Sequence, residues 1–174
     1  NDYSRLCSLY LLLAMQARNL KRNDDIYLYG KKAIEYGKLA GNKNLLLYAY
    51  SNFGNQIMNQ DIHQSKWALN EALEVIKNYN KILPVYSVAI TQANAAKLYF
   101  KLNEFELAYQ LIIPSIKKLK KINNNNEINS AKLILVELEI QHNKLKHAEK
   151  LLQEVEKISL EFNHKTALVQ CYQC

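Results

Sequence analysis

The stretch AITQANAAKLYFKLNEFELAYQLIIPS, residues 89–115, holds two amphipathic helical patterns joined by a polar turn at residues 102–104. Within it, Ala96, Tyr99 and Ala108 supply a small residue, an aromatic residue and a second small residue. Two closely crossing helices need this combination, because small side chains let the backbones approach and the ring fills the space beside them. The stretch therefore predicts a helical hairpin.

The same pattern recurs along the chain at a nearly fixed period. The first helix of each hairpin has a central residue, and these are Ala14, Gly54, Ala96 and Val136. They are separated by 40, 42 and 40 residues. The matching residues of the second helices are Ile26, Ala68, Ala108 and Ala148. The only break is two extra residues in the turn around residues 61–63, where an insertion costs little loop-closure entropy. A period of this length predicts stacked helical hairpins.

We therefore expect an all-α fold, an α-solenoid that forms a single domain over residues 1–174. Its hairpins are predicted at about residues 3–41, 42–80, 82–122 and 125–163, and residues 164–174 would begin a fifth. Because one hairpin cannot bury its apolar face alone, stability should come from stacking between neighbours. The chain starts at Asn and stops inside a helical pattern. We thus expect a part of a longer protein, whose uncovered ends could associate end to end.

Three local signals refine the helices. Asn23 and Asp24 are predicted to cap the second helix of the first hairpin, and Gly41 to end it. Pro114 lies well inside the helix expected from Glu104 to Lys121, where it removes a hydrogen bond to the carbonyl of Gln110 and should kink the helix. The kink either sets local curvature of the array or is simply tolerated at an exposed bend.

The small–x–x–Tyr pattern of Ala96 and Tyr99, followed nine residues later by Ala108, resembles the tetratricopeptide repeat (TPR). Gly54 with Ile57, and Gly30 with Ala33, resemble it as well, whereas Ile26 and Val136 depart from its small residues. The usual repeat is about 34 residues. Stretched repeats of about 40 residues are similar to those of bacterial sensor kinases, LuxR-type and MalT-like regulators, and peptide-sensing regulators. The resemblance implies a right-handed superhelix whose first helices line the concave surface.

Polar residues recur on one face of the predicted first helices. In the second hairpin, the first helix carries Tyr48, Ser51, Asn52, Asn55 and Asn59 on this face. The first helix of the third hairpin carries Ala93, Asn94, Lys97, Phe100 and Lys101. The first helix of the fourth carries Leu133, Glu137, Ile140 and Gln141. A carboxamide both donates and accepts, so it can pair with the backbone of an extended peptide. The predicted peptide-binding or partner-binding residues are Tyr48, Ser51, Asn52, Asn55, Asn59, Asn94, Lys97, Lys101 and Glu137. Alternatively, an Asn-rich composition places Asn on every solvated face.

One binding mode of the family fits this sequence poorly. Members that bind chaperone tails clamp a terminal carboxylate with lysines and asparagines on successive first helices. Here the corresponding lysine positions hold Leu11, Ser51 and Ile90. A chaperone-tail clamp is therefore not expected.

The charge of +7 and the pI near 9.2 permit an acidic partner, but the lysines are scattered. Their one dense run, residues 117–121, ends a helix, where the helix dipole favours cations. The alternative, contact with an anionic surface or nucleic acid, lacks aromatic interleaving or a recognition helix. We therefore expect no nucleic-acid partner. We also expect no membrane contact, because the longest apolar stretch, residues 6–17, is too short to span a bilayer.

Metal, redox and catalytic roles find little support. Cys7 lies on an apolar helix face, and Cys171 and Cys174 form a CxxC without a second ligand pair. We expect no metal and no cofactor, and an odd cysteine count favours a reducing compartment. The location is predicted to be cytoplasmic, or periplasmic if a leader was removed. The His, Asp and Glu residues are predicted on separate, mostly solvated helix faces, so no enzymatic activity is expected.

Two functions remain. The first is a non-catalytic protein- or peptide-binding domain, the sensory or regulatory module of a bacterial signal-transduction protein such as a histidine kinase or a transcriptional regulator. The second is a structural scaffold or self-assembling array without a small ligand. Replacing Asn55 and Asn94 with Ala should abolish ligand binding without unfolding only if the first is correct.

Overall fold

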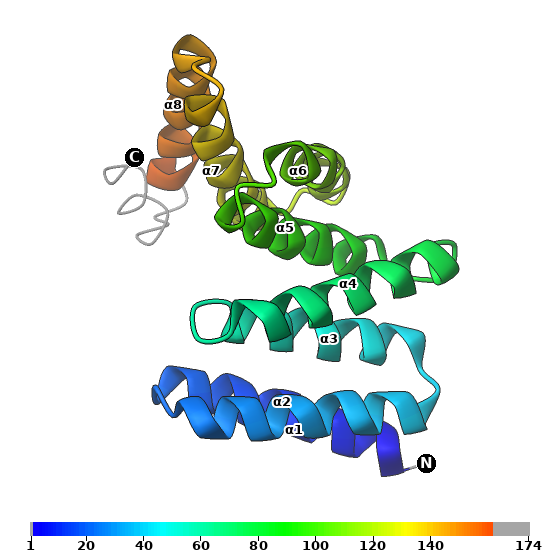
Figure 1. Cartoon of the computed structure of the whole chain (residues 1–174). Helices are drawn as coiled ribbons and strands as arrows, with labels where there is room; N and C mark the ends of the chain where they lie inside the picture. The colour runs from blue at the N-terminus through cyan, green and yellow to red at the C-terminus, as the bar shows by residue number, and fades with distance from the viewer. Residues whose placement is uncertain (1, 162–174) are drawn as a thin grey trace.

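The computed structural model describes residues 2–161, which form helices joined by short turns. The helices are α1 (Asp2–Asn19), α2 (Asn23–Ala40), α3 (Lys43–Ile57), α4 (Ile62–Tyr79), α5 (Val85–Lys101), α6 (Phe105–Lys121), α7 (Asn125–Gln141) and α8 (Leu145–Glu161). Consecutive helices pack as antiparallel pairs that follow one another along the array (Figure 1). The predicted all-α solenoid of helical hairpins is thus confirmed. The predicted start of a fifth hairpin, 164–174, lies outside the described residues.

The turns inside three of the hairpins share one backbone design. In each, the middle residue has a positive φ and the next N–H donates to a carbonyl in the last turn of the preceding helix. In the third hairpin, Asn103 has φ 59° and Glu104 N–H donates to the Tyr99 carbonyl at 2.9 Å. This is a Schellman turn, which satisfies carbonyls left unpaired at a helix end. The equivalent middle residues are Lys21 and Asn143, and Asn123 forms a similar turn between α6 and α7.

The second hairpin has a different turn. Helix α3 ends at Ile57 and α4 begins at Ile62, so the break in the period lies between these two helices. Asp61 caps α4 by accepting a hydrogen bond from the Gln64 N–H at 2.9 Å. Gly41 ends α2 with φ 67°, as predicted. The predicted cap at Asn23 is wrong, because Arg22 occupies the cap position of α2 and no side chain bonds there.

Small residues allow the close helix contacts that the sequence predicts. Ala96 and Ala108 are fully buried where α5 crosses α6, and the Tyr99 hydroxyl donates to Asn70 Oδ1 at 2.6 Å. At Gly54, a Cβ atom would lie 2.7 Å from Leu69 Cγ, closer than side chains pack. One buried cluster lies mainly in the first two hairpins and reaches Val88 of α5, and another lies mainly in the last two and reaches Leu69 of α4. Leu73 of α4 packs against both. The core therefore runs along the array.

The contacts between helices define its inner side. The odd-numbered helices contact one another in order, α1 with α3, α3 with α5, and α5 with α7. Within residues 2–161, the backbones of the even-numbered helices do not come close to one another, and α2 meets α4 through long side chains such as Lys31, which donates to Gln64 Oε1 at 2.8 Å. The even-numbered helices must therefore spread apart while the odd-numbered ones converge. The array curves, and the odd-numbered helices form its concave side.

Candidate functional site: a groove across α3, α5 and α7

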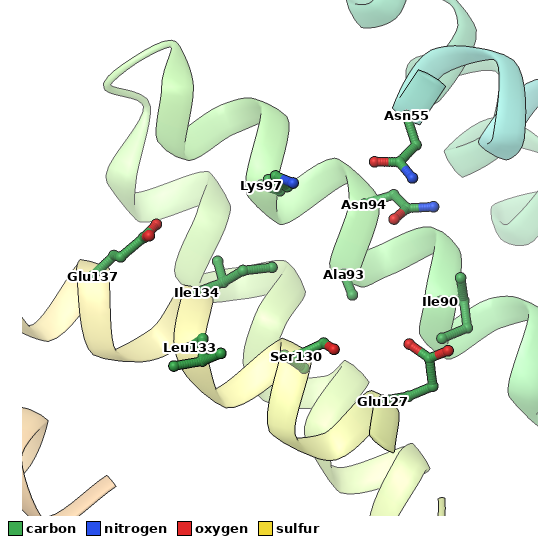
Figure 2. A pocket seen from close by; sticks show the side chains of 11 residues that line it. Asn55, Ile90, Ala93, Asn94, Lys97, Glu127, Ser130, Leu133, Ile134 and Glu137 are labelled. Carbon is green, nitrogen blue, oxygen red and sulfur yellow. The ribbon is translucent and has the colours of Figure 1, made fainter. Parts of the chain in front are cut away.

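A pocket of about 370 Å³ lies on the concave side, between helices that are consecutive there. Figure 2 shows its lining, with Asn55 from α3, Asn94 and Lys97 from α5, and Glu137 from α7. Its apolar floor comes from α5 and α7 and consists of Ile90, Ala93, Ala131, Leu133 and Ile134. Glu127 and Ser130 complete the lining.

The period of the chain explains why these residues meet. Asn55, Lys97 and Glu137 are 42 and 40 residues apart, so they hold the same position on three successive inner helices. The same holds for Asn94 and Ile134, and for Ile90 and Ser130. Because stacked repeats present equivalent positions side by side, each row of residues crosses the groove from one helix to the next. The groove is a direct product of the repeat.

The nine residues predicted from the sequence have different places. Asn55, Asn94, Lys97 and Glu137 line the pocket. Lys101 lies outside the lining, exposed one helical turn beyond Lys97. The other four do not line it. They are Tyr48, Ser51, Asn52 and Asn59.

Three of those four have structural surroundings that the sequence did not indicate. Ser51 is buried, and its Oγ accepts a hydrogen bond from Asn94 Nδ2 at 3.1 Å, which fixes the Asn94 side chain. Asn52 donates to the Tyr48 carbonyl of its own helix at 2.9 Å. Asn59 was predicted on the face of this helix but lies in the turn after it, because α3 ends at Ile57. Asn55, rather than Asn52, accompanies Asn94 in the pocket.

Charged groups face each other across the groove. Burial raises the pKa of the Glu137 carboxyl, against the opposing effect of Lys97 and Lys101. Burial lowers the pKa of Lys97, and the positive charges of Lys101 and Arg18 lower it further. Both side chains remain accessible to solvent, so this desolvation comes from the groove walls around them. Arg18 comes from α1, and no spacing in the sequence pointed to its proximity to Lys97.

Several lining residues were missed although the repeat could have identified them. Ile134 and Ser130 follow Asn94 and Ile90 by the 40-residue period. By contrast, Phe100 and Ile140, which the sequence placed on this face, do not line the pocket, and Phe100 packs against Phe105. Glu127, in the first turn of α7, has no counterpart among the polar residues predicted on the inner helices, so the repeat did not point to it.

A second polar cluster lies between α6, α7 and α8, away from this groove. Glu139 is buried, with Oε1 3.0 Å from His147 Nδ1 and Oε2 3.7 Å from Lys144 Nζ. It holds the repeat position that Tyr99 occupies in the third hairpin. Burial beside this carboxylate raises the pKa of the Tyr109 phenol. The prediction that the titratable groups lie on separate solvated faces is therefore wrong here.

No protein-family model matches the chain, and no curated protein is significantly similar to it. Within residues 2–161, no helix is both long and apolar enough to cross a membrane. The same residues contain no group of three or more His, Cys, Asp or Glu side chains arranged to hold a metal ion. Cys171 and Cys174 lie outside the described range.

Proposed function

We propose that this chain is a non-catalytic TPR-like domain that binds an extended peptide or partner segment in the groove across α3, α5 and α7. The observation that carries the proposal is the pocket itself, which equivalent positions of three successive inner helices line. It combines carboxamides, facing charges and an apolar floor. These groups suit a polypeptide, which presents backbone amides together with side chains of different polarity.

The two pocket asparagines have different roles. Asn94 is held by Ser51, so its carboxamide is oriented before a ligand arrives, which reduces the entropy lost on binding. Among the described residues, the Asn55 side chain makes no hydrogen bond, unlike those of Asn52 and Asn94. Its carboxamide can therefore pair with a peptide without breaking an internal bond.

The wider setting of the proposal rests on the stretched period of about 40 residues alone. Repeats of this length resemble those of bacterial regulators and sensor kinases. We accordingly propose that the domain is the sensory or regulatory module of a bacterial signal-transduction protein and acts in the cytoplasm. Ligand binding would change the curvature of the array, and an output domain would respond to it.

The test is selection from a random peptide library, followed by calorimetry with single variants. Asn55→Ala and Asn94→Ala should each weaken binding of a selected peptide about fivefold or more, because each removes a paired carboxamide. Asn78→Ala, on exposed α4 surface, is the matched control and should bind as the wild type does. Ser51→Ala removes only the hydrogen bond that orients Asn94. Its affinity for the peptide should therefore lie between those of the wild type and Asn94→Ala. Equal binding by wild type and Asn55→Ala would contradict the proposal.

A second candidate, a self-assembling scaffold, is favoured by the outer face of α1. Leu9 and Leu12 are 49% and 56% exposed. The position of Leu9 corresponds to Ala49 of α3, which is fully buried in the cluster that runs through the first two hairpins. Sedimentation at increasing concentration tests this candidate. Self-association that Leu9→Lys with Leu12→Lys abolishes would support the scaffold, and a monomer at all concentrations would contradict it.

A further inference from the structure

One row of the groove carries an ordered set of charges. Asn55 of α3, Lys97 of α5 and Glu137 of α7 occupy equivalent positions on consecutive inner helices (Figure 2). A ligand that follows the row across the helices therefore meets an amide, then a cation, then a carboxylate. Lys101 lies one helical turn from Lys97, and the charge of Arg18 also acts on it. The middle of the row is thus basic.

These groove charges lack the close ion pairs that other charges of the array form. Lys66 lies 2.7 Å from Glu104, and Lys132 lies 2.8 Å from Glu154. Within residues 2–161, neither Lys97 nor Glu137 has an oppositely charged group within 4.0 Å. Both are partly desolvated by the groove walls. Complementary charges on a ligand would therefore interact with them at a low cost in lost hydration.

We propose that the groove selects an extended segment of a partner protein that carries an acidic side chain and a basic side chain about three residues apart. This inference rests on the proposed peptide-binding function. The acidic side chain binds beside Lys97, Lys101 and Arg18, and the basic side chain binds Glu137. An apolar side chain between them packs on Ala93, Leu133 and Ile134, which form the floor there.

The spacing follows from helix packing. Packed helices lie roughly 8–10 Å apart, and an extended chain rises about 3.3 Å per residue. Neighbouring groove positions are therefore about three residues apart on the ligand. A terminal carboxylate is not required, since the lysine positions of the carboxylate clamp hold Leu11, Ser51 and Ile90. The partner can present the segment within its chain.

Three fluorescent peptides with acetylated and amidated ends test the inference. They share a Leu and Ser background and carry Glu and Lys, two Glu, or two Lys at the two charged positions. Fluorescence anisotropy should show that the wild type prefers the Glu and Lys peptide by roughly tenfold. Lys97→Glu should shift the preference to the two-Lys peptide, and Glu137→Lys should shift it to the two-Glu peptide.

Matched controls carry the same changes in net charge on the exposed surface of α4. Lys77→Glu and Glu74→Lys alter an exposed pair far from the groove lining, and both should keep the wild-type preference. Circular dichroism would verify that each variant is folded. Because Lys97 and Glu137 are exposed, their replacement should not unfold the array.

The outcomes separate this inference from the proposed function. A preference that switches with each groove variant supports both. If library-selected peptides bind and depend on Asn55, but no probe shows a charge preference that the groove variants switch, the charge inference is wrong and the proposed function stands. If neither the probes nor any library peptide binds in a way that depends on Asn55, both are wrong.

Discussion

Individual glycines decide how closely the helices of a hairpin approach. A Cβ at Gly54 would lie 2.7 Å from Leu69 Cγ and 3.1 Å from the Ser65 carbonyl oxygen. At Gly37, also inside a helix, the nearest atom would be the Leu46 Cα at 3.4 Å, an ordinary contact. The two buried glycines therefore differ in the space around them, although both lie in helices where Ala has the higher helix propensity.

Alanine substitution should therefore destabilise the protein at Gly54 but not at Gly37. Gly54→Ala should lower the free energy of unfolding by about 1–2 kcal/mol, because overpacking outweighs the gain in helix propensity. Gly37→Ala should leave it unchanged or raise it by up to about 1 kcal/mol. Urea unfolding followed by circular dichroism measures both. A Gly54→Ala variant as stable as the wild type would show that α3 and α4 can move apart freely.

The buried Lys132 should make stability depend on pH through its partner. The Lys132 side chain is only 6% exposed, and its hydrogen bond to Glu154 is the main cause that lowers the pKa of that carboxyl. The pKa of Glu154 is thus lower in the folded state than in the unfolded state. Its contribution to stability is fully present above the unfolded-state pKa, near 4.3, and is lost as the pH falls through the folded-state pKa. The pair therefore stabilises the fourth hairpin at neutral pH.

Replacing this carboxylate should remove that pH dependence. At pH 7, Glu154→Gln should be less stable than the wild type by about 1–2 kcal/mol, because Lys132 loses a charged acceptor. The two proteins should converge as the pH falls below about 4. Glu74→Gln, in an exposed pair with Lys77, should cost less than about 0.5 kcal/mol and serves as the control. Urea unfolding at a series of pH values measures this, and a constant difference between the proteins would contradict the assignment.

At the scale of the element, α6 continues through Pro114 as one helix from Phe105 to Lys121. The proline leaves the Gln110 carbonyl without its helical N–H partner. Pro114→Ala should therefore raise the free energy of unfolding by about 1–3 kcal/mol. Lys117→Ala, on the exposed surface of the same helix, should change it by less than about 0.5 kcal/mol.

The same variant distinguishes the two interpretations of the proline. If Pro114 sets the curvature of the array, Pro114→Ala should also change the affinity of a selected peptide. If the proline is merely tolerated within the helix, only the stability should rise. A variant less stable than the wild type would show that packing around α6 requires the proline.

The pairing of the helices could be predicted from the sequence, whereas the residues at which helices begin and end could be predicted only in part. The small residues Gly54, Ala96 and Ala108 recur at a fixed period, and they specify close contacts that stacking alone can satisfy. The predicted cap at Asn23 was wrong because the preceding turn places Arg22 there. A turn conformation of this kind depends on backbone hydrogen bonds, such as Arg22 N–H to the Ala17 carbonyl, which composition does not reveal.

At the scale of the whole molecule, the groove could be predicted in part. The period brings Asn55, Lys97 and Glu137 into one row, and this follows from the sequence. The proximity of Arg18 to Lys97 does not, because it depends on the curvature of the array. The bond from Asn94 to Ser51 also depends on the packing of α3 against α5. Local patterns thus fix the repeat, while curvature decides which distant side chains meet.

The central claim is that the concave groove across α3, α5 and α7 binds a peptide. Hydrogen–deuterium exchange of the protein with and without a library-selected peptide tests it most directly. We predict reduced exchange in α5 and α7 around the pocket and in the last turns of α3, with the even-numbered helices unchanged. Protection confined to the even-numbered helices, or to the outer face of α1, would contradict the claim.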